Sequence, residues 1–202
     1  MVTIGVLASG NGSNFQAIAE YLASHRLPAR IGVVITDNPT AGVLVRAAKF
    51  GIPAQCIPSP GHRTFLEPDI ETLYVSCLRE YGVNLVCLAG FMRVLKKPLL
   101  GAFPERIINI HPSLLPAFPG LEAWKQALEY GVRFTGCTVH YVDPGVDTGP
   151  IILQAVVPVL DNDTAQSLHA RIQEKEHLIY PLAVRLIAEG RVRRSGRRVI
   201  LR

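Results

Sequence analysis

The feature that most constrains the fold is the alternation of short apolar runs, rich in β-branched residues, with segments of helical period. Such alternation is typical of a parallel sheet whose strands are joined by crossover helices. It predicts strands at residues 2–8, 31–36, 54–57, 84–89 and 107–110. The intervening segments predict helices at residues 14–24, 41–50 and 64–81.

The second half of the chain has a different pattern. Two strand-like runs, GCTVHYVD at 136–143 and PIILQAVVPV at 150–159, are separated by a short turn-rich segment, which favours an antiparallel pair. A final helix fits residues 164–188, with Asp163 as N-cap and Pro181 expected to bend or interrupt it. The predicted fold class is therefore α/β: a single-domain, Rossmann-like open twisted sheet, mostly parallel with an antiparallel portion in the C-terminal half.

Composition fits one globular domain. The chain has 202 residues, 49% of them hydrophobic, and a mean hydropathy of +0.25, which is enough for one sizeable core. We assign residues 1–190 to this domain and residues 191–202 to a basic C-terminal hairpin or tail. The net charge is +5, but the segment RVRRSGRR at 191–198 alone contains five arginines. A solvated hairpin is favoured over a nucleic-acid contact, because no RNA- or DNA-binding motif accompanies these arginines.

Composition does not indicate metal binding, disulfides or membrane insertion. The cysteines are scattered, without a CxxC pair or histidines at ligand spacing, so neither a zinc site nor a disulfide framework is expected. No apolar run approaches the length of about 18 residues that a membrane span needs. The first residues read as a strand that runs into a glycine-rich turn, not as a signal peptide. We therefore expect a cytoplasmic protein.

The segment SGNGSN, residues 9–14, follows the first predicted strand at the point where a helix should begin. Glycines allow backbone N–H groups to crowd around a ligand, and a helix N-terminus adds partial positive charge, so a phosphate group is the natural guest. The segment is neither a GxGxxG fingerprint nor a P-loop, because its spacing differs and it has no lysine. The alternative is a tight turn in which the side chain of Ser13 or Asn14 caps the helix.

Asn109 and His111 stand two residues apart at the end of an apolar run. Side chains at i and i+2 of a strand point to the same face, so both should project together at the strand's carboxyl end. Asp147, in the glycine-containing segment PGVDTGP, is the carboxylate expected beside them. Because a carboxylate favours and orients a protonated imidazole, such a trio can stabilise an oxygen that becomes negative in a tetrahedral intermediate. Asp143 is the rival carboxylate, but it precedes a proline and could simply start a turn.

The segment AGFMRVL, residues 89–95, ends another predicted inner strand. Core packing explains its apolar residues about as well as contact with a flat ligand, so both interpretations stand. In an open α/β sheet, the ligand crevice lies outside the carboxyl ends of the strands. The segments GNGSN, GFMRVL and NIHPSLLP should all converge there.

In order along the chain, the segments SGNGSNFQA, AGFMR, NIHPSLLPAFPG, TGCTVHYVDPGVDTGPII and KEHLIYP resemble the phosphoribosylglycinamide formyltransferase family. The resemblance covers nearly the whole chain. It implies transfer of the formyl group of 10-formyltetrahydrofolate, a co-substrate, to the amino group of glycinamide ribonucleotide in purine biosynthesis. It also implies small-molecule substrates, no metal, no nucleic-acid or membrane partner, and a monomer or homodimer.

The resemblance further implies roles for individual residues. The catalytic residues would be Asn109, His111 and Asp147. The phosphate of the ribonucleotide would bind at Gly12, Ser13 and Asn14, and its ribose near Gln173 and Glu176. The folate would contact Arg63, Met92, Arg93, Val94, Leu95, Asn109, Asp143, Val146 and Asp147. Glu122 and Trp124 depart from the pattern, because many members carry histidines at these positions.

Related and unrelated functions remain as alternatives. Methionyl-tRNA formyltransferases share the asparagine, histidine and aspartate, but they differ after SLLP and carry a further C-terminal domain that we do not expect here. Formyltetrahydrofolate hydrolases carry an N-terminal regulatory domain that we do not expect before MVTIGVLASG. A non-catalytic nucleotide-binding module would need only the glycine-rich turn and the sheet, and it gives no reason for the trio.

Overall fold

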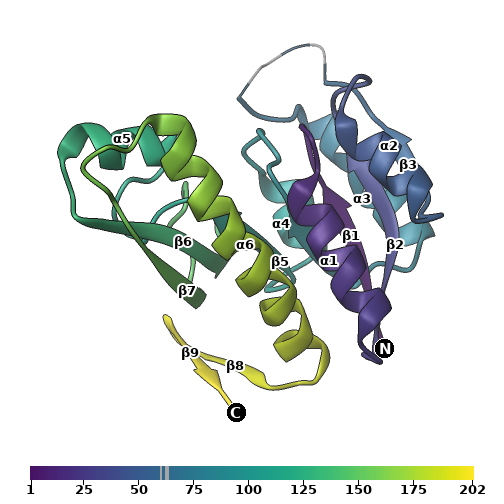
Figure 1. Ribbon diagram of the computed structural model, residues 1–202. Helices are drawn as coiled ribbons and strands as arrows, with labels where there is room; N and C mark the ends of the chain where they lie inside the picture. The colour runs from purple at the N-terminus through teal and green to yellow at the C-terminus, as the bar shows by residue number, and fades with distance from the viewer. Residues whose placement is uncertain (60, 62–63) are drawn as a thin grey trace. The chain divides into compact units, whose positions relative to one another are not determined.

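The computed structural model describes residues 1–59, 61 and 64–202, and the chain divides into two compact units, Met1–Asn109 and Ile110–Arg202. The first unit alternates strands and helices (Figure 1). Its strands are β1 (Val2–Leu7), β2 (Ala29–Thr36), β3 (Ala54–Cys56), β4 (Leu85–Leu88) and β5 (Ile107–His111). They are parallel and follow the order β3-β2-β1-β4-β5. The predicted strands of this half are confirmed, and β5 carries the chain into the second unit.

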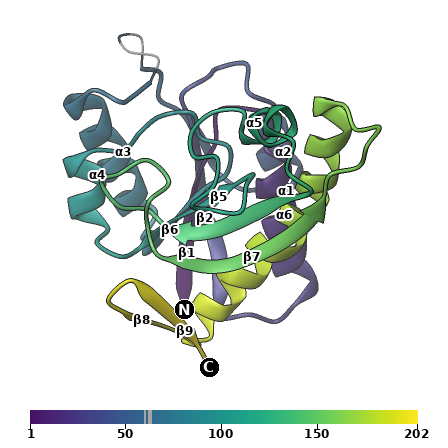
Figure 2. The same cartoon turned by 90° about the vertical axis from the view of Figure 1, so that its left-hand side faces the viewer.

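Helices cover this parallel sheet on both faces. They are α1 (Ser13–Ser24), α2 (Gly42–Lys49), α3 (Pro68–Glu80) and α4 (Lys97–Ala102). Figure 2 shows α3 and α4 on one side of β1 and β2, and α1 and α2 on the other. The helix predicted at 64–81 begins only at Pro68, since proline suits the first turn of a helix and has no N–H to pair. The sequence did not predict α4.

β1 positions the glycine-rich turn, and it is buried along almost its whole length. Ile4, Val6 and Leu7 have no exposed surface. Gly5 is needed between them, because a Cβ atom there would collide with the side chain of Leu78 from α3. The close approach of α3 to the sheet therefore depends on a glycine.

The second unit contains antiparallel strands, as the sequence predicted. Its elements are α5 (Ala123–Tyr130), β6 (Phe134–Tyr141), β7 (Ile151–Pro158), α6 (Ala165–Ala188), β8 (Val192–Ser195) and β9 (Arg198–Leu201). β6 and β7 are antiparallel, and α6 packs against both. β8 and β9 form an antiparallel hairpin at the basic end of the chain, whereas the domain boundary at residue 190 stays a prediction. The chain is thus an α/β protein, mostly parallel with antiparallel strands in its C-terminal half.

The start of α6 differs from the prediction. The N-cap is Thr164 and not Asp163: Thr164 Oγ1 accepts a hydrogen bond from the Ser167 N–H at 3.1 Å, and Ser167 Oγ accepts one from the Thr164 N–H at 2.9 Å. This capping box satisfies two backbone donors reciprocally. Asp163 instead pairs with Arg171, with 2.7 Å between Oδ1 and Nη2, and its side chain is only 2% exposed.

Pro181 lies inside α6, and the helix runs through it without a break. Of the two expected effects, an interruption is therefore wrong, and a bend stays a prediction. Its neighbours Tyr180, Ala183 and Val184 are fully buried, so packing of the helix offsets the backbone hydrogen bond that proline removes. Within the described part of the chain, no helix is both long enough and apolar enough to cross a membrane.

Glu71 is a carboxylate of α3 with no exposed surface. Its Oε1 accepts a hydrogen bond from the Lys96 N–H at 2.5 Å, and its Oε2 accepts one from the Leu99 N–H at 3.3 Å. Glu71 therefore caps the N-terminus of α4 from a different helix. Burial raises the pKa of this carboxyl group, and the hydrogen bonds from Lys96 and Leu99 oppose that rise.

Replacing Glu71 with alanine should lower the free energy of unfolding by about 1–3 kcal/mol, because buried donors lose their acceptor.

Because the folded-state pKa of Glu71 is raised, the folded chain holds the proton of this carboxyl group more tightly than the unfolded chain. Wild-type stability should therefore fall as pH rises from the usual range of a glutamate through the raised pKa. Glu71→Gln should remove this slope, which urea unfolding at several pH values measures. A slope that persists in Glu71→Gln would assign the titration to another group.

Candidate functional site

β5 ends in the two polar residues that the sequence singled out. Ile107, Ile108 and Ile110 are buried, and Asn109 and His111 leave the strand on the same face. Asn109 is half-buried, and His111 is 5% exposed. An apolar strand thus presents an amide and an imidazole at its carboxyl end.

His111 lies beside Asp147 in the second unit, with 3.3 Å between Nδ1 and Oδ2. The other ring nitrogen, Nε2, lies 2.9 Å from the carbonyl oxygen of Phe118. Because both ring nitrogens face acceptors, only a doubly protonated ring donates a hydrogen bond at each. The geometry therefore suits an imidazolium held by a carboxylate, while the catalytic role of the pair stays a prediction.

Asp147 is held in an uncommon backbone conformation, with a φ of 54°. Aspartate enters this region more readily than most residues. The Gly120 N–H donates a hydrogen bond to Asp147 Oδ2 at 2.8 Å, and Asp147 Oδ1 lies 3.7 Å from Nε2 of His140. The carboxylate is thus shared between a backbone amide and two imidazole rings, which fixes its orientation beside His111.

His140, on β6, is a neighbour that sequence reasoning missed. It is 2% exposed, and its Nδ1 lies 2.9 Å from the carbonyl oxygen of Tyr141. Burial lowers the pKa of His140, against the opposing effects of that carbonyl and of Asp147. The available signal was a single histidine between Val139 and Tyr141 in a strand-like run.

The loop that carries Asp147 is shaped by Asp143. Oδ1 of Asp143 accepts hydrogen bonds from the Gly145 N–H at 3.1 Å and from the Thr148 hydroxyl at 2.6 Å. Asp143 therefore starts a turn, as one interpretation of the sequence held. Val146, at the tip, is 52% exposed. The loop thus offers an apolar side chain outward and keeps the Asp147 carboxylate inward.

The loop between β5 and α5 is fixed by the two antiparallel strands. Thr138 Oγ1 donates a hydrogen bond to the Ser113 carbonyl at 2.7 Å and accepts one from the Leu115 N–H at 3.1 Å. Gln154, on β7, donates to the Leu115 carbonyl at 3.0 Å. These hydrogen bonds hold the loop that supplies the backbone partners of the His111–Asp147 pair.

The glycine-rich turn lies between β1 and α1 in the first unit. Gly12 is the N-cap of α1 with a φ of 79°, a conformation that favours glycine. A Cβ atom there would lie 2.7 Å from Cγ2 of Val43. Gly12 holds the N-cap position, and Ser13 and Asn14 are the first two residues of the helix, so neither is its N-cap. The first turn contains no acidic residue, which favours an anion at this helix start.

The segment after β4 alternates between exposed and buried side chains. Met92 and Val94 are 55% and 41% exposed, whereas Leu95 is buried. Arg93 turns toward Asp37, with 2.6 Å between Nε and Oδ2. Core packing therefore explains Leu95, while Met92 and Val94 are available to a ligand.

Gln173 and Glu176 lie one turn apart on one face of α6. Gln173 is half-buried, and Glu176 is 5% exposed. Burial and the nearby Glu176 carboxylate raise the pKa of the Cys137 thiol on β6 to about 12.

The remaining residues named from the sequence have separate outcomes. Arg63 lies outside the described residues. Glu122 has a φ of 52° and pairs with Lys125, with 2.5 Å between Oε1 and Nζ. Trp124 stacks on His169 of α6, with 3.8 Å between ring centroids. Among residues 1–59, 61 and 64–202, no group of three or more His, Cys, Asp or Glu side chains could hold a metal ion.

A family model described as "Formyl transferase" matches residues 2–184. The chain belongs to the formyl transferase family. As a formyl transferase it shares its fold with the crystal structure of glycinamide ribonucleotide transformylase 1 from Symbiobacterium toebii. That protein is 52% identical with a TM-score of 0.95, and the match covers 100% of this chain and 94% of the other.

Other relatives of this formyl transferase have related names. Phosphoribosylglycinamide formyltransferase of Bacillus subtilis (strain 168) is 42% identical over 92% of this chain and 94% of its own length. The trifunctional purine biosynthetic protein adenosine-3 of Drosophila pseudoobscura pseudoobscura is 45% identical, but the chain spans only 14% of its length. A formyltetrahydrofolate deformylase from Pseudomonas syringae pv. tomato is 25% identical with a TM-score of 0.91, and the chain covers 65% of it.

Proposed function

We propose that this formyl transferase is a phosphoribosylglycinamide formyltransferase. It would transfer the formyl group of 10-formyltetrahydrofolate to the amino group of N1-(5-phospho-D-ribosyl)glycinamide, giving formylglycinamide ribonucleotide and tetrahydrofolate. The observation that carries this proposal is the His111–Asp147 pair, 3.3 Å apart, at the end of the strand that also bears Asn109. The names of the bacterial relatives that match over most of their length support it.

In the proposed mechanism, the neutral amine of the ribonucleotide attacks the formyl carbon directly. The formyl oxygen becomes negative and receives hydrogen bonds from the Asn109 amide and the His111 imidazolium. Because Nε2 of His111 lies against the Phe118 oxygen, the formyl oxygen would take that place when the co-substrate binds. Asp147 keeps the ring charged and aligned and, through water, relays the amine proton to N10 of the folate as the carbon–N10 bond breaks.

The proposed binding residues are those that the resemblance implies. Residues Gly12, Ser13 and Asn14 would hold the phosphate of the ribonucleotide, and Gln173 and Glu176 its ribose. The folate would contact Arg63, Met92, Arg93, Val94, Leu95, Asn109, Asp143, Val146 and Asp147. We also propose a cytoplasmic location, a reaction without metal, and a monomer or homodimer without nucleic-acid or membrane partners.

An assay with both substrates tests the proposed function. The purified chain is incubated with 10-formyltetrahydrofolate, with and without glycinamide ribonucleotide, and tetrahydrofolate release is followed by absorbance. We expect release only with the ribonucleotide, together with a formylated ribonucleotide detected by mass spectrometry. Formate release without the ribonucleotide would indicate hydrolysis instead. Calorimetric binding of the ribonucleotide but not of a folate analogue would indicate a nucleotide-binding module.

Gly12→Ala should raise the KM for the ribonucleotide by roughly tenfold, because alanine costs about 1–2 kcal/mol at positive φ and its Cβ would push against Val43. The KM for the folate should stay within error. Steady-state kinetics with each substrate varied in turn measures both. Gly101→Ala is the matched control, since an added Cβ meets nothing within 4 Å there. Equal increases in both KM values in Gly12→Ala would contradict a phosphate-specific role.

A further inference from the structure

Residues 90–96, which follow β4, are tied to the first unit at both ends. At their start, the Ser9 N–H donates a hydrogen bond to the Gly90 carbonyl at 3.1 Å, and the Met92 N–H donates one to Ser9 Oγ at 3.0 Å. Ser9 follows β1, the strand beside β4. Ser9 therefore fixes the first half of this segment to the neighbouring strand end.

The second half is fixed by a different part of the same unit. The Val94 N–H donates a hydrogen bond to the Thr64 carbonyl at 2.9 Å, and the Lys96 N–H donates one to the buried Glu71 carboxylate at 2.5 Å. Backbone donors that are paired with the surrounding protein hold a loop in one shape. These hydrogen bonds thus hold both ends of residues 90–96 in place.

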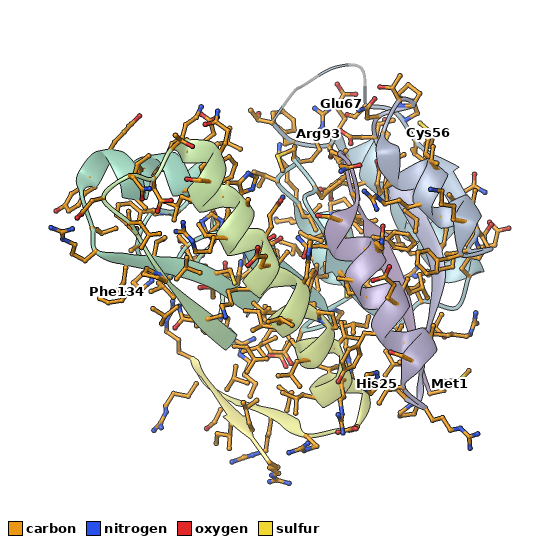
Figure 3. All side chains as sticks on the ribbon, viewed as in Figure 1. Met1, His25, Cys56, Glu67, Arg93 and Phe134 are labelled. Carbon is orange, nitrogen blue, oxygen red and sulfur yellow. The ribbon has the colours of Figure 1, made fainter. Side chains whose placement is uncertain are left out.

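The middle is held by an ion pair between Arg93 and Asp37, with 2.6 Å between Nε and Oδ2. Both side chains are largely buried, 14% and 5% exposed. Asp37 follows β2 and Arg93 follows β4, and β1 lies between these strands. The pair therefore crosses the carboxyl end of β1. Figure 3 shows Arg93 at the end of the first unit opposite Met1, where β1 starts.

Burial of this ion pair makes it weak evidence for a stabilising role. Burying two charges removes both from water, and the mutual attraction repays that loss only when the remaining hydrogen-bonding groups are satisfied. Within the described residues, the second carboxylate oxygen of Asp37, Oδ1, is buried without a hydrogen-bond partner. The pair therefore serves geometry better than stability, and it lies at the carboxyl edge of a parallel sheet, where ligands bind in such folds.

The ion pair also decides which side chains face outward. With Arg93 turned toward Asp37 and Leu95 buried, Met92 and Val94 are exposed. The positive charge of Arg93 is compensated inside the protein. The segment would therefore receive a ligand through its backbone and the apolar side chains of Met92 and Val94.

We propose that Asp37 is a positioning residue for the formyl-folate. Its ion pair with Arg93 fixes the backbone of residues 92–95 in the shape that receives the co-substrate, and Arg93 acts as an anchor, not as a ligand for a negative charge. This inference rests on the proposed function, because it assigns the segment to the folate.

Asp37→Ala should raise the KM for 10-formyltetrahydrofolate by roughly tenfold through misplacement of the segment, and leave kcat and the KM for the ribonucleotide within about twofold. Asp37→Asn should restore most of the wild-type KM, since an amide oxygen still accepts from Arg93. The double variant Asp37→Ala/Arg93→Met leaves no lone buried charge. Its folate KM should match that of Asp37→Ala, because both changes remove the same anchor.

The control is Asp163→Ala in the second unit, which also breaks an ion pair of a buried carboxylate. It should lower the melting temperature and leave the folate KM unchanged. Three outcomes would overturn the inference: an unchanged folate KM in Asp37→Ala, equal increases in both KM values, or a folate KM of Asp37→Ala/Arg93→Met well above that of Asp37→Ala. The last would make Arg93 a direct ligand.

The same variants separate this inference from the proposed function. If the wild-type chain showed no transfer that depends on the ribonucleotide, the proposed function would fail at that step. Calorimetric titration with a folate analogue would then still compare wild type with Asp37→Ala. A loss of affinity of about tenfold would support the positioning role, and unchanged affinity would reject it.

Discussion

His111→Ala is expected to lower kcat for formyl transfer by about two to three orders of magnitude, the usual cost of one oxyanion donor. The reason is geometric. The ring lies 3.3 Å from the Asp147 carboxylate and is largely buried, so a hydrogen bond from it would be oriented and poorly screened by water. Single-turnover and steady-state assays with both substrates saturating measure the loss. The two KM values should change much less, because the proposed contact forms with the transition state.

The control for His111→Ala is His25→Ala, which removes an exposed histidine stacked on Tyr21 at the end of α1. It should keep wild-type kcat. His111→Asn should fall between alanine and wild type, since an amide still donates a hydrogen bond but carries no charge. Turnover of His111→Ala within a few-fold of wild type would remove this ring from the mechanism.

The strands of the first unit could be predicted from sequence because each signal is local. A parallel strand covered on both faces must be apolar throughout, and β1 is buried in this way. The glycine-rich turn could likewise be located, because Gly12 adopts a positive φ that favours glycine between β1 and α1. Burial of a strand and a positive φ at a glycine each depend on residues that are adjacent in the sequence. The sequence pattern is therefore enough to predict them.

The helices α4 and α5 could not be predicted, because their stabilising contacts come from distant residues. α4 begins beside a proline, and its N-terminus is capped by Glu71, which lies 25 residues before Lys96 in the chain. The helix α5 follows Glu122 at positive φ and is anchored by the stacking of Trp124 on His169. Nothing within either short segment records these contacts.

Some residues of the candidate site could be predicted from the sequence, and others could not. Asn109 and His111 follow from the two-residue period of a strand, and Asp147 from its glycine-containing turn. The residues that contact them could not be predicted from the sequence. The Phe118 carbonyl reaches His111 only because its loop is folded back by tertiary hydrogen bonds, and the Asp37–Arg93 pair joins residues 56 positions apart.

Asp147→Asn is expected to lower kcat by roughly three orders of magnitude, because the neutral amide no longer favours the charged, correctly oriented imidazole of His111. The substitution removes the negative charge of the side chain and keeps nearly the same size and shape. Asparagine also accepts the positive φ of this position, and its oxygen can keep the hydrogen bond from the Gly120 N–H. The melting temperature should therefore change little, and Asp161→Asn, at an exposed residue paired with Arg133, should leave kcat unchanged. If Asp147→Asn retained near-normal turnover, the loop carboxylate would only support the backbone, and the imidazolium would need another source of stabilisation.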